Sequence, residues 1–362
     1  MTTRPLRHGY TTGACAAAAA KGAARMLREQ RPVEEIEITL PLGERAAFRL
    51  HGQEFTENRA SCFVVKDAGD DPDVTNGAEI HVTVRREPLT RSGAKTMVFV
   101  SGGRGVGKVT KPGLAVAVGE PAINPVPLRM IAEGVRGEFP VACLPQALYV
   151  TVSIPNGEEL AKKTLNARLG IVGGLSILGT TGIVKPISAK AWTDTLDAAI
   201  DVALACGCGA VVLSTGRTSE LAAQKAEIGN ALPEEAFVMM GDHVGYALRA
   251  CARKGVKRVI LAGQFAKLLK IACGHEQTHV SSSELDLREL ATWVGSELHD
   301  PVLAQMIREA NTARQVLVDT GGYQPLLALV CRKAREAAGR IAPGLETEVL
   351  LAGYDSTVLY FG

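Results

Sequence analysis

Hydrophobic and polar residues alternate along the first half of the chain, which is the pattern of strands with one buried face. Alternation predicts strands at 33–40 and 80–84, an apolar run predicts one at 63–66, and further strands are predicted at 46–50, 96–100 and 149–154. Before them, Thr11 precedes five alanines at 16–20, and a polar cap followed by alanines favours a helix that extends to Glu29. A shorter helix, 128–133, is predicted after a proline-rich start. Together these elements predict an α+β lobe.

From about residue 189 the pattern changes to regular alternation of helices and strands. Helices are predicted at 189–205, 218–229, 243–254 and 265–273, separated by strands at 210–214, 236–240 and 258–262. Further helices near 284–298, 300–311 and 323–338 and a last strand at 347–353 complete this half. The alternation predicts a mostly parallel, Rossmann-like sheet covered by helices. We therefore predict two domains: an α+β, glycine-rich lobe at 1–188 and an α/β lobe at 189–362.

Composition and charge narrow the range of partners. The 362 residues include 40 basic and 38 acidic side chains, a net charge of +2, and only 4% aromatics. This balance argues against binding of nucleic acid, which requires a basic surplus and base-stacking rings. No apolar run is long enough to span a membrane, and the first residues lack the apolar core of a signal peptide, so a cytoplasmic protein is expected. A homo-oligomer stays an open alternative.

The loop that follows the predicted strand 63–66 is rich in charge. Lys66 is followed by four aspartates, Asp67, Asp70, Asp71 and Asp73. Glycine, proline and asparagine among them indicate a shaped loop. The composition favours a solvated turn whose aspartates cap backbone N–H groups, and a functional loop is the alternative.

A glycine-rich stretch, 102–108, matches the start of a phosphate-binding P-loop, GxxxxGK. The next position should be Ser or Thr to reach a magnesium ion, but it is Val109. A helix should also follow, but 114–118 has the pattern of a strand. These differences exclude a nucleotide triphosphatase. They leave either a glycine loop whose N–H groups, with Lys108 and Lys111, bind another anion, or a glycine-rich hairpin.

Residues 275–279, HEQTH, match the zinc-protease motif HExxH. That motif requires both histidines on one helix face and a glutamate that acts as general base. Here Gly274 precedes the motif, and Ser281 to Glu284 fits a capping box that predicts the start of a new helix. The motif is therefore expected in a loop, with no protein-bound metal. A zinc-dependent hydrolase is kept as an alternative function.

Six stretches of the chain, in order along nearly its whole length, resemble one family. They are GYTTGACAAAAAKGAA at 9–24, VVKDAGDDPDVTNGAEI at 64–80, GGRGVGKVTKPGLAVAVGEPAINPVPLRMI at 102–131, IPNGEELAKKTLNARLGIVGGLSILGTTGIVKPIS at 154–188, MGDHVGYAL at 240–248 and GQFAKLLKIACGHEQTH at 263–279. The family that they resemble is the cobalt-precorrin-5B C(1)-methyltransferases of anaerobic cobalamin biosynthesis.

The resemblance implies methyl transfer from S-adenosylmethionine to carbon 1 of a cobalt-containing, partly built corrin ring, which gives cobalt-precorrin-6A. Cobalt would arrive with the corrinoid substrate and not as a metal of the protein. A non-catalytic tetrapyrrole-binding protein is a further alternative. The physical requirement for the transfer is to hold donor and acceptor in line and to exclude water.

Residue positions within the two lobes suggest where each ligand binds. The donor is expected at the carboxyl ends of the second lobe's strands, near Gly216, Gly241, Asp242 and Gly263. Asp242 would accept hydrogen bonds from the ribose. The ring is expected to contact the first lobe, where Lys66, Lys108, Lys111 and Lys185 would bind its carboxylates and Asp70 would face the ring. Asp67 and His279 are the candidate catalytic residues, His279 because a neutral imidazole can exchange protons near pH 7.

Overall fold

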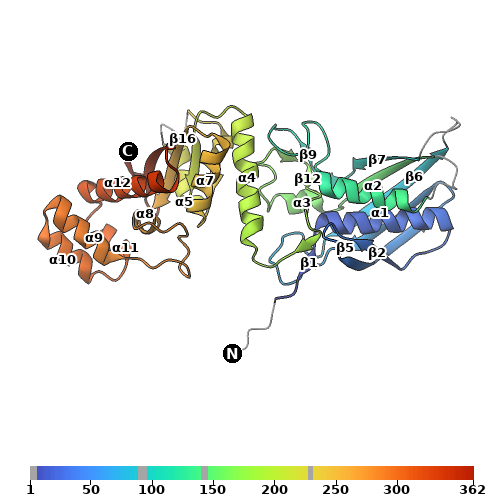
Figure 1. Ribbon diagram of the computed structural model, residues 1–362, viewed down its shortest axis with the longest axis horizontal. Coiled ribbons are helices and arrows are strands. Elements are labelled where there is room, and N and C mark those ends of the chain that lie inside the picture. The colour runs from blue at the N-terminus through green and yellow to red at the C-terminus, as the bar shows by residue number, and fades with distance from the viewer. Residues whose placement is uncertain (1–5, 89–95, 140–145, 227–230) are drawn as a thin grey trace. The chain divides into compact units, whose positions relative to one another are not determined.

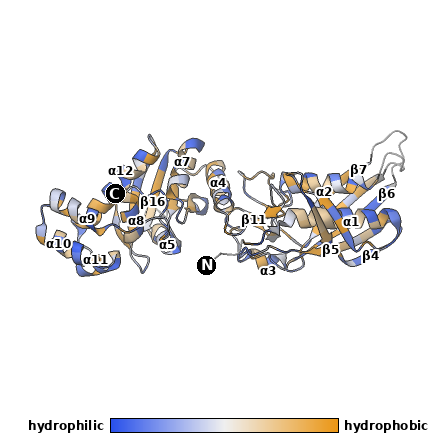
Figure 2. Ribbon diagram, turned by 60° about the horizontal axis from the view of Figure 1, so that its bottom comes forward, coloured by the Kyte–Doolittle hydropathy of each residue, from blue (hydrophilic) through white to orange (hydrophobic). Residues whose placement is uncertain are grey.

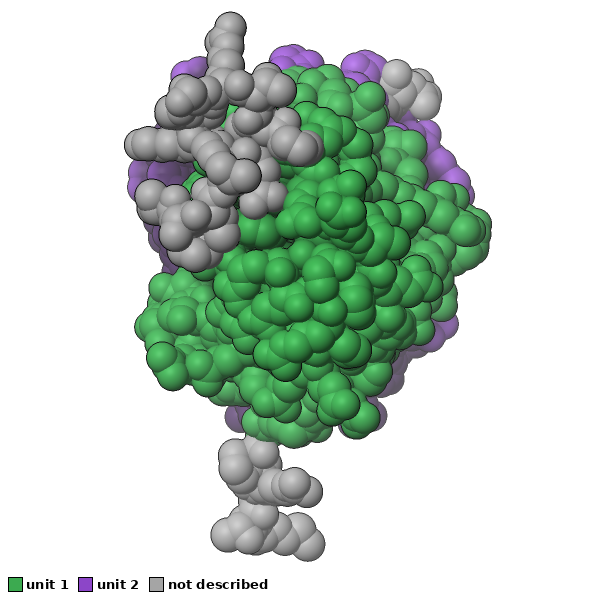
Figure 3. Space-filling model, turned by 90° about the vertical axis from the view of Figure 1, so that its right-hand side faces the viewer, with its two compact units in different colours: residues 1–188 green, residues 189–362 purple. Residues whose placement is uncertain are grey.

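The structure, a computed structural model, describes residues 6–88, 96–139, 146–226 and 231–362 (Figure 1). The chain divides into two compact units, Met1–Ser188 and Ala189–Gly362, which Figure 3 distinguishes by colour. The division falls where the regular alternation of helices and strands begins. Within the described ranges, the helices are all too short or too polar to cross a membrane.

The first unit is built on a five-stranded sheet with the order β4-β5-β6-β10-β7. Its strands are β4 (His51–Phe55), β5 (Arg59–Val65), β6 (Glu79–Pro88), β7 (Met97–Gly102) and β10 (Gln146–Ser153). Neighbours are antiparallel except for β10 and β7, which are parallel. Helices α1 (Thr12–Glu29) and α2 (Pro125–Gly137) pack against each other and against this sheet (Figure 1).

Strand alternation and small helix residues explain this packing. β5 points Ala60, Cys62 and Val64 into the core, as its alternating pattern predicts. The alanines of α1 are almost completely buried and bring the helix backbone close to the strands. Thr11 caps the helix, its hydroxyl accepting the Ala14 N–H at 3.2 Å. Both helices mix hydrophobic and hydrophilic residues, as helices that cover a sheet require (Figure 2).

Short strand pairs join distant parts of the first unit. The hairpin β2–β3 is antiparallel, as are β1–β13 and β9–β11, and β8–β12 is parallel. Their bounds are β1 (Gly9–Tyr10), β2 (Glu35–Thr39), β3 (Arg45–Arg49), β8 (Gly105–Val106), β9 (Lys108–Val109), β11 (Ile171–Val172), β12 (Gly174–Leu175) and β13 (Ile183–Val184). A short helix, α3 (Gly157–Ala161), precedes β11. These pairs hold the glycine-rich segments against one another.

The second unit has a five-stranded sheet with the order β15-β14-β16-β17-β18, in which β18 is the only antiparallel member. Its strands are β14 (Val211–Ser214), β15 (Phe237–Met239), β16 (Arg258–Gln264), β17 (Glu346–Ala352) and β18 (Val358–Phe361). Its helices are α4 (Ala189–Ala205), α5 (Arg217–Lys225), η1 (Glu234–Ala236), α7 (Val244–Lys254), α8 (Phe265–Ala272), α9 (Leu287–Trp293), η2 (Val294–Leu298), α10 (Pro301–Glu309), α11 (Ala313–Asp319) and α12 (Gln324–Ile341).

Helices cover both faces of this sheet. Val212 packs with Ala222 and Ala223 of α5 on one face, whereas Val211 and Leu213 contribute to the large core formed with α4, α7, α8 and α12. When the four parallel strands β14 to β17 are numbered 1 to 4 by their order along the chain, they lie side by side in the sheet in the order 2-1-3-4. The chain therefore leaves β14 and β16 toward opposite faces, and the carboxyl ends of these two strands mark the topological switch point of the sheet.

The structure confirms a mixed α/β chain but corrects several predicted elements. The predicted strand 114–118 is wrong: these residues form bends and a turn between Gly113 and Gly119, whose φ angles are +101° and +96°. They are apolar because Leu114 and Val116 cover a small hydrophobic cluster around Val109. The prediction also missed β4, α11 and β18.

Candidate donor site and substrate loops

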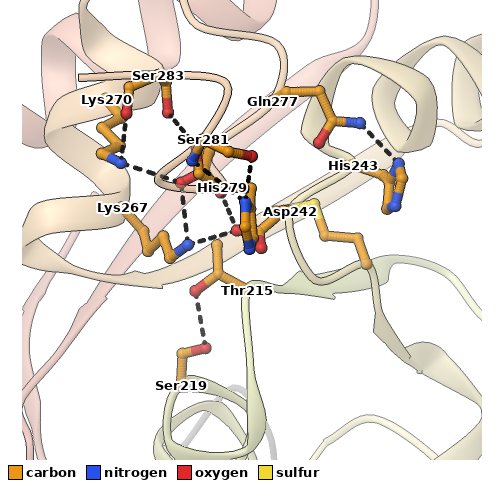
Figure 4. A network of polar contacts seen from close by, with 12 residues as sticks. Thr215, Ser219, Asp242, His243, Lys267, Lys270, Gln277, His279, Ser281 and Ser283 are labelled. Atoms are coloured by element: carbon orange, nitrogen blue, oxygen red, sulfur yellow. Dashed lines mark hydrogen bonds and ion pairs between the residues drawn. The ribbon is translucent and has the colours of Figure 1, made fainter. Parts of the chain in front are cut away.

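Three chain segments meet at the carboxyl edge of the second unit's parallel sheet. Backbone hydrogen bonds join them: the Met240 N–H donates to Ser214 O at 2.9 Å, and the Thr215 N–H donates to Ala262 O at 3.0 Å. The loop 274–283, which follows α8, adds further polar groups here (Figure 4). This edge is therefore the place where side chains from separate strands can act on one ligand.

Asp242 is the anionic centre of this edge. Its Oδ1 atom accepts hydrogen bonds from Lys267 Nζ and from Thr278 Oγ1, the latter at 2.5 Å, and its backbone carbonyl accepts the Thr278 N–H at 3.1 Å. Burial opposes ionisation, but the bonds from Lys267 and Thr278 outweigh it and hold the pKa of Asp242 below its usual value. The carboxylate is therefore ionised at neutral pH, and Oδ2 has no donor among the described residues.

Two lysines of α8 fix the loop 274–283 (Figure 4). Lys267 Nζ donates to Thr278 O at 3.1 Å, and Lys270 Nζ donates to the same oxygen at 3.2 Å and to Ser283 O at 2.9 Å. Burial and the neighbouring charge of Lys267 lower the pKa of Lys270. The two ammonium groups satisfy carbonyls that would otherwise lie unpaired, so this loop has a defined position beside Asp242.

His279 is exposed in this loop, and its hydrogen bonds fix its tautomer. The Ser281 N–H lies 3.2 Å from His279 Nδ1, and Ser281 Oγ lies 2.7 Å from the same atom. Because a backbone N–H can only donate, Nδ1 accepts, and the neutral ring has its proton on Nε2. His279 therefore presents a donor and not a base to its surroundings. An acid–base role for His279 stays a prediction.

The three glycines expected to expose backbone to the donor differ from one another. A Cβ placed on Gly216 would meet no atom within 4 Å. Gly241 has a φ of +61°, and its Cβ would lie 3.1 Å from the Trp192 ring. Gly263 is buried, and its Cβ would lie 2.9 Å from Leu268 Cδ2. Gly263 is therefore small because Leu268 packs against it, whereas the backbone at Gly216 has room beside it for a ligand.

The HEQTH residues, 275–279, lie in a loop and not on one face of a helix. The Glu276 carboxylate is paired with Arg249, whose Nη1 lies 2.9 Å from Oε1, and this pair holds the pKa of Glu276 below its usual value. A metalloprotease requires this carboxylate as its general base. The predicted helix start at Ser281 is wrong, because α9 begins later with Asp286 as its cap.

In the first unit, Lys66 closes the aspartate-rich loop from inside. The residue is 2% exposed, and its Nζ donates to Asp73 Oδ2 at 2.7 Å. Asp73 Oδ1 in turn accepts the Thr75 N–H at 2.7 Å. This geometry argues against the predicted contact between Lys66 and a substrate carboxylate, because the ammonium is buried and already paired with Asp73.

The other three aspartates attach distant segments to the loop. Asp67 pairs through both oxygens with the Arg7 guanidinium, Asp70 Oδ2 accepts the Arg7 N–H at 2.6 Å, and Asp71 Oδ1 accepts the Ile187 N–H at 2.9 Å. The bonds from Arg7 and from the Gly69 N–H lower the pKa of Asp67. Since a general base works best with a pKa near the working pH, Asp67 in this pair is a weak base. Its catalytic role stays a prediction.

Backbone hydrogen bonds join the glycine loop 102–111 to other segments of the first unit. Its N–H groups donate to carbonyls in three pairs: Gly103 to Val152 at 2.7 Å, Gly107 to Leu175 at 2.9 Å and Thr110 to Gly170 at 2.7 Å. A Cβ on Gly105 would lie 1.9 Å from Ile154 O. The expected anion cradle of N–H groups is therefore wrong at these positions, and the glycines permit close backbone packing.

The remaining predicted substrate contacts lie on the surface of the first unit. Lys108 on β9 and Lys185 after β13 are exposed, and Lys111 is half-buried. Their contact with substrate stays a prediction. Sequence reasoning missed Arg7, whose partner lies 60 residues away, and Lys267. Lys267 could have been found from the sequence, because it and Lys270 are the two charged residues of an otherwise apolar helix, FAKLLKIA.

Comparison with protein-family models gives two matches. Residues 1–186 match the model described as CbiD, and residues 277–361 match the model described as CbiD, C-terminal domain. Among curated proteins, the chain is 76% identical to a cobalt-precorrin-5B C(1)-methyltransferase from Geobacter sulfurreducens, over the full length of both. A protein with the same description from Geobacillus sp. is 44% identical, covering 91% of this chain and 89% of its own.

One solved structure is also similar: a crystal structure of a cobalamin biosynthesis protein (cbiD) from Archaeoglobus fulgidus. It is 30% identical and covers 74% of this chain and 79% of its own, with a TM-score of 0.38.

Proposed function

The chain belongs to the CbiD family, and on that premise we propose that it transfers a methyl group from S-adenosylmethionine to carbon 1 of cobalt-precorrin-5B, giving cobalt-precorrin-6A. The observation that supports this most strongly is identity of 76% over the full length of relatives described as cobalt-precorrin-5B C(1)-methyltransferases. The reaction belongs to anaerobic cobalamin biosynthesis, and cobalt enters with the substrate.

The chemistry assigns a limited set of tasks to the protein. The methyl–sulfur bond breaks while the bond to carbon 1 forms, and the sulfur keeps the electron pair as S-adenosylhomocysteine leaves. The sulfonium is already an activated donor, so the protein must align the two reactants and exclude water. A small misalignment of the methyl donor and the acceptor carbon lowers the rate by a large factor, so the elements that hold each ligand must be rigid.

We propose that the donor binds at the carboxyl edge of the second unit's sheet, across the switch point between β14 and β16. Doubly wound, Rossmann-like sheets bind nucleosides at this place. Gly216 offers open backbone, and Asp242 Oδ2 is an acceptor for the ribose hydroxyls, while Gly241 supports the turn that presents Asp242. His279 would donate a hydrogen bond through Nε2 from the neighbouring loop. These groups fit a neutral nucleoside better than a polyphosphate.

The ring substrate is proposed to contact the first unit. Its carboxylates would pair with the exposed ammonium groups of Lys108 and Lys185 and with Lys111. Asp67 and Asp70 act on substrate indirectly in this proposal, because both hold the N-terminal segment at Arg7. The aspartate-rich loop thus supplies a fixed wall and not a set of charges for the ring.

Turnover with both substrates tests the proposal. The purified protein, mixed with S-adenosylmethionine and cobalt-precorrin-5B, should produce S-adenosylhomocysteine and a ring heavier by one methyl group. Ring binding without donor binding would instead support a non-catalytic tetrapyrrole-binding protein. Hydrolytic activity that depends on zinc and disappears in His275→Ala would support the hydrolase alternative.

A further inference from the structure

Ser214, the last residue of β14, has a hydroxyl that needs a partner. The residue is completely buried, and its Oγ has no hydrogen-bond partner within the described part of the chain. Its register neighbour Ala262 and the preceding inward residue Val212 both pack on the α5 side of the sheet, so Ser214 Oγ points to that side. Because α5 runs back antiparallel to β14, its first turn lies nearest to the end of the strand. The hydroxyl therefore faces the start of α5.

The start of α5 is open in the same place. Its cap residue is Gly216, which supplies no side-chain hydrogen bond, and the N–H groups of Arg217 and Thr218 have no acceptor among the described residues. Thr215 Oγ1 and Ser219 Oγ lie 3.3 Å apart beside this turn (Figure 4). Unpaired N–H groups at the positive end of a helix dipole favour an anion.

The charges around this turn select the kind of anion. The Arg217 guanidinium is 63% exposed and reaches Glu220 Oε1 only at 3.5 Å, so it can turn to a ligand. The Glu220 side chain is completely buried one turn into the helix, and its Oε1 atom also lies 3.4 Å from Gln224 Nε2. A ligand group with a single negative charge, such as the carboxylate of an amino acid, fits beside a buried carboxyl side chain better than a phosphate dianion does.

We propose that the first turn of α5, together with Ser214 and Arg217, binds the carboxylate of the methionine part of S-adenosylmethionine. The assignment rests on the proposed methyl transfer and deepens it, because it fixes the direction of the donor. With the carboxylate at α5 and the ribose at Asp242, the sulfonium lies between them over the ends of β14 and β15. The Gly241 N–H, which donates to Ser214 O at 3.2 Å, joins these two subsites.

The test compares two donors that differ only in the carboxylate: S-adenosylmethionine and decarboxylated S-adenosylmethionine. Calorimetric titration of the full-length protein should show at least about tenfold tighter binding of the intact donor. Arg217→Gln and Ser214→Ala should each reduce this preference several-fold and leave the affinity for the decarboxylated donor unchanged. Lys225→Gln, at the other end of α5 and exposed, should keep the wild-type preference.

Each other result has a distinct meaning. Equal affinity for both donors in the wild-type protein, or a preference that persists in Arg217→Gln and Ser214→Ala, overturns the carboxylate site while leaving methyl transfer intact. If Arg217→Gln weakens binding of the corrinoid and not the donor preference, the carboxylate belongs to the ring, which also refutes the assignment. Failure of the wild-type protein to bind either donor refutes the proposed function together with this site.

Discussion

Removal of the Asp73 charge should destabilise the first unit strongly, because it leaves a buried ammonium without an anion. Lys66 is 2% exposed and its Nζ lies 2.7 Å from Asp73 Oδ2. Loss of one partner from a buried ion pair costs about 3–5 kcal/mol. The Asp73 side chain is 25% exposed, so water reduces the penalty, and we expect about 3 kcal/mol for Asp73→Asn. For a unit of this size that lowers the midpoint of thermal unfolding by about 6–12 °C.

The two tryptophans make a sharp assay possible. Trp192 and Trp293 both lie in the second unit, so their fluorescence follows that unit while far-ultraviolet circular dichroism follows both. Asp73→Asn should lower the transition that circular dichroism detects and leave the fluorescence transition in place. Asp70→Asn is the matched control in the same loop, because Asp70 is exposed and pairs with a backbone N–H; it should change stability by less than about 1 kcal/mol.

Acid supplies an independent check of the same pair. Burial raises the pKa of Asp73, but the hydrogen bonds from Lys66 and Thr75 outweigh it, and the net pKa is below the usual value. Stabilisation from a carboxyl with a lowered pKa is complete above the unfolded pKa, about 4, and is lost as the pH falls through the folded pKa. The difference between wild type and Asp73→Asn should therefore shrink below about pH 4. A difference under about 1 kcal/mol at pH 7, or one that persists unchanged in acid, would refute the reasoning.

Three further results are expected. Gly105→Ala should lower the free energy of unfolding of the first unit by about 3 kcal/mol, measured in denaturant, because the new Cβ would lie 1.9 Å from Ile154 O at a φ of +72°. Gly119→Ala is the control: its φ is also positive but its Cβ would meet no atom, so it should cost about 1 kcal/mol. Glu138→Gln should cost about 3 kcal/mol in the same measurement, because the buried carboxylate pairs with two arginines of α1. Lys108→Ala should weaken corrinoid binding about tenfold in titration without changing the unfolding midpoint; unchanged affinity would remove this lysine from the substrate site.

Elements whose residues obey a local pattern were predictable from the sequence. The parallel strands β14 and β16 are short apolar runs between helices, and local sequence located both, whereas the predicted strand 63–66 overlaps only the end of β5. The segment 114–118 is also an apolar run but forms bends and a turn. Its apolar residues cover Val109, a contact that depends on how distant segments pack and not on the segment itself.

The candidate site was less predictable, because residue type does not reveal the partner of a charged group. Lys66 resembles a surface lysine in the sequence, yet Asp73 pairs with it in the interior. Asp242 was correctly placed at the end of a strand, but its bonds to Lys267 and Thr278 come from residues 25 and 36 positions away. The position of the switch point follows from the strand order 2-1-3-4, which depends on long-range strand pairing.

The central claim is methyl transfer to one carbon of the ring, and isotope labelling tests it most directly. The protein is incubated with cobalt-precorrin-5B and S-adenosylmethionine that has an isotope-labelled methyl group, and the product is examined by nuclear magnetic resonance. The account predicts one labelled methyl group per ring, attached to carbon 1, and one S-adenosylhomocysteine per methyl transferred. Label at any other carbon, or an unlabelled ring after incubation with an intact donor, would contradict it.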